Sequence, residues 1–311
     1  MTCQQIPKEE SYEFFENIEE YIKTAKSAEN TVGLSIGESG CNSFMTSFGS
    51  LFTVNTTAKI ICKQFIKLYN SLTALKCNSN SNTNYKKCRD FLNYWVNFKL
   101  IEAMKNKDNS VSNVYDHLEA EITGTDFSTN LVCIQDINKE ILKKMNILYS
   151  LYEKYIDLRT ILNDESNVNT AKTLSYSNEC VNNYNKAISM CKGKKNKFFE
   201  ELEKYKKKYE TLYELVEKRR SDYYTSFVRL TNDNNNIVTT SVLGTTVGLV
   251  PLFGLLYKFT PIGQLFNLKS RTLTKEYSNN GKERKNNPLM DYENEQMNLE
   301  QERYNIKYHS V

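Results

Sequence analysis

Apolar residues recur every three or four positions along most of the first 230 residues, which is the spacing of one face of an α-helix. In 57–75 the apolar positions step by four and three, while lysines occupy another face; the apolar ones are Ile61, Phe65, Leu68, Leu72 and Leu75. No segment alternates with the two-residue period of a half-buried strand, and no proline lies between Pro7 and Pro251. The pattern predicts an all-α fold with several helices.

The same periodicity predicts where the individual helices lie. They are expected over 8–28, 57–75, 88–104, 110–123, 136–162, 168–191 and 194–230. The last keeps its rhythm for more than thirty residues, which predicts one continuous helix of about 50 Å. Gly33, Gly37 and Gly40 are interpreted as a break between the first two helices.

The helix at 88–104 carries a dense apolar stripe, which includes Phe91, Trp95 and Phe98. Trp95 is the only tryptophan of the chain. A large ring within such a stripe is expected to pack in the core rather than to stack on a ligand.

Residues 234–257 contain no charged residue, and about 20 apolar residues suffice for a helix to cross a bilayer. The alternative is a buried core helix, because the first half of this stretch is rich in threonine. Pro251 favours the membrane interpretation, since membrane helices tolerate proline better than soluble ones do. The sequence thus predicts a helical domain (1–233), one transmembrane helix in the lipid bilayer (234–257) and a short polar tail (258–311). Gly244 and Gly248 form a GxxxG pair, a weak signal for homo-association.

Basic residues collect on the cytoplasmic flank of a membrane span. The upstream flank carries three and the downstream flank four: Arg219, Arg220 and Arg229 against Lys258, Lys269, Arg271 and Lys275. The tail is therefore expected in a cytosol and the helical domain outside or in a lumen. The first 21 residues lack the apolar core of a signal peptide, so the internal stretch is expected to act as both signal and anchor.

All eight cysteines precede residue 234, which agrees with an oxidising environment for the helical domain; a reduced domain with scattered thiols is the alternative. Cys77 and Cys88 flank a polar Asn/Ser loop, so a bridge between them is expected. Cys180 and Cys191 would lie about 16 Å apart on one helix and are expected to bridge to other helices. The remaining disulfide candidates are Cys41, Cys62 and Cys133. Asn55-Thr56-Thr57 is a glycosylation sequon, which is a weak signal.

Catalytic chemistry leaves no trace in the sequence. The two histidines, His117 and His309, lie on opposite sides of the uncharged stretch, and no P-loop, GxGxxG, GxSxG, HExxH or CxxC motif occurs. The sequence predicts no enzyme, no catalytic residue, no cofactor and no metal site. The 41 basic and 37 acidic residues nearly balance, which argues against a nucleic-acid partner.

Two segments resemble a known family. YKFTPIGQ at 257–264, with Thr260, Pro261, Ile262 and Gly263 as its motif, and CRDFLNYWVNF at 88–98 resemble the Plasmodium interspersed repeat (PIR or VIR) proteins. Residues 264–267 depart from the more basic run that is typical of the family. The resemblance implies a non-enzymatic variant antigen of a malaria parasite, which is displayed at or exported to the infected red-cell membrane. It further implies that the helical domain binds an unknown host protein or cell-surface ligand.

A second hypothesis places the function in the tail. KSRTLTKE and GKERKNNP are basic stretches that can bind an anionic lipid surface or cytoskeletal proteins, at about 1 kcal/mol per basic residue near the leaflet. The chain would then be a membrane-tethered scaffold or trafficking protein.

Overall fold

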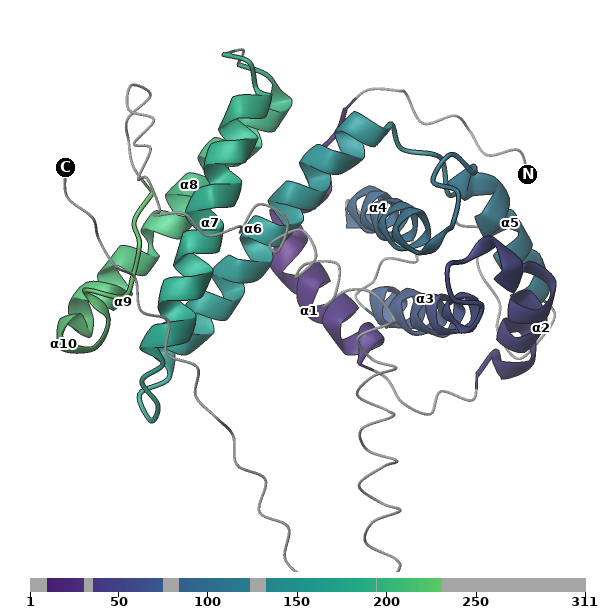
Figure 1. Cartoon of the computed structure of the whole chain (residues 1–311), viewed down its shortest axis with the longest axis horizontal. Coiled ribbons are helices and arrows are strands. Elements are labelled where there is room, and N and C mark those ends of the chain that lie inside the picture. Colours follow the sequence, from purple (N-terminus) through teal and green to yellow (C-terminus); the bar gives the residue numbers. More distant parts are fainter. Residues whose placement is uncertain (1–9, 31–35, 75–83, 124–132, 194, 231–311) are drawn as a thin grey trace, which may run out of the picture. The chain divides into compact units, whose positions relative to one another are not determined.

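The computed structural model describes residues 10–30, 36–74, 84–123, 133–193 and 195–230, and its helices form one packed unit (Figure 1). Within these ranges there is no β-strand, and extended pairing is limited to isolated bridges such as that between Phe52 and Met104. The predicted all-α fold is confirmed. The helices are α1 (Ile18–Glu29), α2 (Glu38–Phe48), α3 (Thr56–Ala74), α4 (Asn84–Ala103), α5 (Val111–Ile122), α6 (Lys139–Asn163), α7 (Thr170–Met190), α8 (Lys197–Glu210), α9 (Leu212–Lys218) and α10 (Arg220–Tyr223), with 3-10 turns η1 (Glu13–Asn17) and η2 (Gly49–Leu51).

Helix α6 joins two groups of helices. It contacts α1 and α4 on one side and α7, α8 and α9 on the other (Figure 1). Because α6 is covered from both sides, even Glu153 and Lys154 are buried, with 3% and 5% of their surfaces exposed. Both are neutralised by ion pairs: Glu153 with Lys26 at 3.1 Å, and Lys154 with Glu179 at 2.8 Å. These pairs satisfy charges that would otherwise be costly to bury.

Helix α2 corrects the interpretation of Gly40, whereas Gly33 lies outside the described residues. Residues 38–48 are helical, and the helix starts directly after Gly37, whose φ of 67° suits glycine. Gly40 lies inside α2, where an added Cβ would be 2.5 Å from the carbonyl oxygen of Glu121 in α5. The glycine therefore allows α2 and α5 to approach closely rather than breaking the chain.

The single long helix expected at 194–230 is wrong. The segment divides into α8, α9 and α10, after which the chain folds back. The Tyr209 hydroxyl donates to the carbonyl oxygen of Val228 at 2.7 Å, and Phe227 stacks on the same ring at 5.5 Å between centroids. The return segment covers apolar rings that one straight helix would leave exposed.

The predicted membrane span, 234–257, lies outside the described residues, as does the tail. In the part of the chain that the structure describes, no helix combines the length and apolar character that crossing a membrane requires. The boundaries at 233 and 257 stay predictions.

Candidate functional site

A disulfide fastens α2 to α3. Cys41 and Cys62 are bonded with their α-carbons 5.5 Å apart, and neither residue has exposed surface. Reactive disulfides and thiols need access to a partner, so burial makes this bond a structural cross-link. Both cysteines were disulfide candidates, but their pairing with each other was not predicted.

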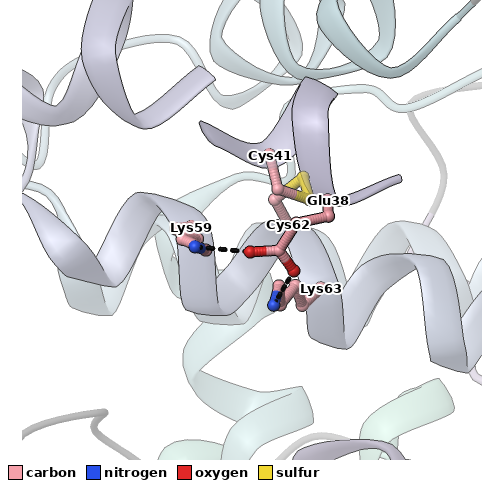
Figure 2. Close-up of a disulfide and its surroundings, with 5 residues drawn as sticks. All are labelled: Glu38, Cys41, Lys59, Cys62 and Lys63. Carbon is pink, nitrogen blue, oxygen red and sulfur yellow. Dashed lines mark ion pairs between the residues drawn. A yellow bond between two sulfur atoms is a disulfide. The ribbon is translucent and has the colours of Figure 1, made fainter. Parts of the chain in front are cut away.

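An ion cluster lies beside the disulfide (Figure 2). Glu38, in the first turn of α2, reaches two lysines of α3: its Oε1 lies 2.6 Å from Nζ of Lys59, and its Oε2 pairs with Lys63. The hydrogen bond from Lys59 and, to a smaller extent, that from Lys63 lower the pKa of Glu38 below its ordinary value of 4.5. The cluster joins the same two helices as the disulfide, at a site where 39% of the glutamate side chain is exposed.

Replacing Glu38 by glutamine is expected to lower the free energy of unfolding at pH 7 by at most about 1 kcal/mol, because the exposed pairs are screened by solvent. The lowered pKa means that the carboxylate stabilises the fold above pH 4.5 and that this contribution is lost as the pH falls through its folded-state pKa. Urea unfolding of parent and variant at pH 7 and in stronger acid measures both effects. The control is Glu214→Gln, an exposed carboxylate that pairs with no described residue. A difference between parent and Glu38→Gln that persists in strong acid would contradict the assignment.

The other cysteines divide into two kinds. Cys88 and Cys133 are disulfide-bonded as well, whereas Cys77 lies outside the described residues and the expected bridge from Cys77 to Cys88 stays a prediction. Cys180 and Cys191 are free, so the expected bridges from α7 to other helices are wrong. Both thiols are buried, and burial raises the pKa of Cys180 to about 12 and raises that of Cys191. They act as small apolar side chains of the core.

Trp95 lies in the core, as predicted, with 1% of its surface exposed. Its Nε1 donates to Oε1 of Glu29 at 3.1 Å, and the same oxygen lies 2.9 Å from Nζ of Lys99, which is also buried. Phe91 is fully buried, while Phe98 is partly buried against the same core. The carboxylate of α1 thus joins two side chains of α4 within the core.

Two asparagines of α4 hold the chain that leads into α6, a role that sequence reasoning missed. Asn93 Oδ1 accepts from the backbone of Gln135 at 2.8 Å, and Asn97 bonds the backbone of Gln135 at 2.8 Å and of Ile137 at 2.9 Å. Both asparagines are buried. The signal was their spacing of four residues on an apolar helix, which directs two amides to the same strip of backbone.

A cleft of about 360 Å³ lies between the η1–α1 segment, α6 and α8. Burial raises the pKa of Glu201 at this cleft, and Lys204 pairs with it at 2.7 Å. Lys208 pairs with Glu19 across the same opening. Paired charges and two aromatic rings are among the residues that line the cleft, which are Phe15, Glu16, Asn17, Ile18, Glu19, Glu20, Tyr152, Glu201, Lys204 and Lys208.

Metal-binding chemistry was not expected, and within the described ranges no group of three or more His, Cys, Asp or Glu side chains is placed to hold an ion. His117 stacks on Phe48 with 4.2 Å between ring centroids.

The family comparison covers nearly the whole chain. The model described as Plasmodium vivax Vir protein matches residues 6–225 and 217–311. The chain belongs to the Vir family. The resemblance to the PIR/VIR proteins is thereby confirmed, and it supports a variant surface antigen of Plasmodium as the class of function. No curated protein and no solved structure matched the chain.

Only one of the two segments that resemble the Vir family lies in the part of the chain that the structure describes. The segment 88–98 lies in α4 and supplies Phe91 and Trp95 to the core, so this part of the Vir sequence serves packing. The motif Thr260, Pro261, Ile262 and Gly263 lies outside the described residues but within the second matched range.

Proposed function

We propose that this Vir protein is a single-pass variant surface antigen, carried to the infected host-cell membrane or to the parasite's export membranes. The helical domain, 1–233, binds a host protein or cell-surface ligand. It acts in host interaction and immune evasion and has no catalytic role. Residues 234–257 anchor the chain in the bilayer, and 258–311 lie in the cytosol.

The disulfide-bonded helical unit directly before the uncharged stretch carries this proposal. Disulfides persist on the extracellular or luminal side of a membrane and are rare in a reducing cytosol. Cys41, Cys62, Cys88 and Cys133 are all bonded, and every cysteine of the chain lies on the same side of 234–257. The charge excess after residue 257 favours the same orientation.

The residues that stabilise the helical unit are buried, so residues on its surface can vary. Large side chains such as Trp95 and Tyr205 lie in the core, and the cross-link between α2 and α3 is buried. Substitutions on exposed helix faces, away from such features, usually change stability by less than about 0.5 kcal/mol. Surface variation can therefore accumulate without unfolding the domain, which is what an antigen under immune selection requires.

Protease added to intact cells that display the protein is expected to remove epitopes before residue 234 and to leave a protected fragment with the tail. Tags in the exposed turn at Glu165 and at the C-terminal Val311 report the two sides, and detergent-permeabilised cells provide the control in which both tags are lost. A protected helical domain with a digested tail would reverse the orientation and exclude a surface antigen.

A second candidate function is a membrane-tethered scaffold whose tail binds anionic lipid or cytoskeletal partners. The basic stretches after residue 268 favour it, because juxtamembrane lysines and arginines are attracted to an anionic leaflet. Co-sedimentation of the tail with phosphatidylserine vesicles, compared with neutral vesicles, tests this candidate.

Homo-association through Gly244 and Gly248 stays a separate prediction, since both glycines lie outside the described residues.

A further inference from the structure

Asn55-Thr56-Thr57 is the only Asn-x-Ser/Thr sequence in the chain. Asn55 lies in the turn between η2 and α3, where it and Thr56 are exposed. Its backbone carbonyl accepts from Ala58 at 3.2 Å, whereas its side-chain amide makes no hydrogen bond with any described residue. The amide nitrogen is thus presented to solvent.

The turn that carries Asn55 is anchored to the end of α4. The backbone of Thr53 donates to Ala103 at 2.9 Å, and that of Lys105 donates to Leu51 at the same distance. Phe52, between these contacts, has no exposed surface. A group attached to the exposed amide would extend into solvent without displacing this anchored turn.

Thr57 has the opposite environment. It lies in the first turn of α3 and only 3% of its surface is exposed. Recognition of the acceptor sequence needs the asparagine amide and the hydroxyl two residues later, and the folded domain covers the second. The sequon also lies inside the loop that the Cys41–Cys62 bond closes.

We propose that Asn55 is an N-glycosylation site and that the sugar is added before the Cys41–Cys62 bond closes. The inference rests on the proposed function, because it requires the helical domain to enter a secretory lumen. The Asn55 amide nitrogen forms a bond to the anomeric carbon of a lipid-linked sugar diphosphate, and the bond from that carbon to the diphosphate oxygen breaks. The amide loses one proton to a base of the transferase, and the lipid diphosphate leaves with the electron pair.

Disulfide closure competes with this transfer for the same stretch of chain. The two thiols give two electrons and two protons to the disulfide of a thiol–disulfide oxidoreductase, which becomes a dithiol. Once α2 and α3 are joined and packed, the Thr57 hydroxyl is no longer accessible. The modified fraction therefore depends on which reaction reaches the loop first.

Cell-free synthesis of the full chain with endoplasmic-reticulum microsomes tests the site. The parent chain is expected to show a slower-migrating form that peptide N-glycosidase removes. Thr57→Ser retains the acceptor sequence and should retain this form, whereas Asn55→Gln and Thr57→Val should lose it. The matched reporter is Glu165→Thr in the Asn55→Gln chain, which completes an acceptor at the exposed Asn163, the last residue of α6.

The reporter separates the two possible failures. If the reporter chain is modified at Asn163 but the parent chain is not modified at Asn55, the proposed site is overturned and the luminal orientation stands. If neither position is modified, the helical domain does not enter the lumen, and both the site and the proposed function fail. Replacing Cys41 and Cys62 together by alanine should increase the modified fraction at Asn55 and leave that of the reporter unchanged. An unchanged fraction at Asn55 overturns the proposed order of the two reactions.

Discussion

Replacing Trp95 by alanine is expected to lower the free energy of unfolding by about 3–5 kcal/mol, because it leaves a large cavity in a core that relaxes only partly. The indole is 1% exposed, and its loss also removes the hydrogen bond from Nε1 to Glu29. Since a domain is typically stable by only about 5–15 kcal/mol, this substitution removes a large share of the total. Urea unfolding of a soluble fragment that ends at Leu230, followed by circular dichroism, measures the loss.

Two variants show whether the Trp95 effect comes from the cavity. Trp95→Phe fills most of the volume and loses the Nε1 hydrogen bond, so it should cost less than the alanine variant. Tyr224→Ala removes an aromatic ring that is 50% exposed and lies 4.3 Å from the Arg220 guanidinium, so it should change stability by at most about 1 kcal/mol. If Trp95→Ala were as stable as the parent but no longer bound a host ligand, Trp95 would be a recognition residue instead.

Removing the Cys41–Cys62 bond by replacing both cysteines with alanine is expected to cost about 3 kcal/mol, the chain-entropy value for a loop of this size. The bonded residues are 21 positions apart, so the bond restricts a sizeable loop of the unfolded chain. Unfolding curves with and without reductant give the measurement. The parent should lose more stability on reduction than the double variant, which keeps the bonds of Cys88 and Cys133.

Alkylation of the folded protein provides an independent check on the cysteines. Without reductant, Cys41 and Cys62 should stay unmodified even after unfolding, whereas the buried thiols of Cys180 and Cys191 should react only once the domain unfolds. Cys180→Ala is the matched control for the double variant at Cys41 and Cys62, because it removes a buried cysteine without removing a disulfide bond. Free alkylation of all eight cysteines in folded, cell-derived material would rule out a disulfide-dependent domain.

The helices with a one-sided apolar pattern could be predicted closely from the sequence. The expected helix at 57–75 corresponds to α3 (Thr56–Ala74), and that at 136–162 corresponds to α6 (Lys139–Asn163). The periodicity is local, so it survives without knowledge of any partner. The burial of Trp95 followed from the same local pattern.

The disulfide partners could not be derived in this way. Eight cysteines allow 105 pairings if all are bonded, and neighbours in sequence need not be neighbours in space. Cys180 shows the difficulty, because its helix places it against α6 and α8, where a thiol packs as an apolar side chain. Only the packing of α2 on α3 brings Cys41 to Cys62.

The sequence by itself determined the all-α class, most helix positions, the core role of Trp95 and the resemblance to the Vir family, because helical periodicity and family motifs are written in short stretches of chain. The tertiary structure decided which helices pack together, the close approach at Gly40, the division of 194–230 into three helices and the partner of Cys41. Each of these depends on contacts between residues far apart in the chain, such as Gly40 with Glu121 and Ser177 with Val228. A local sequence pattern identifies one residue of such a contact but not its partner. Only the packing of the whole domain determines which residue the partner is.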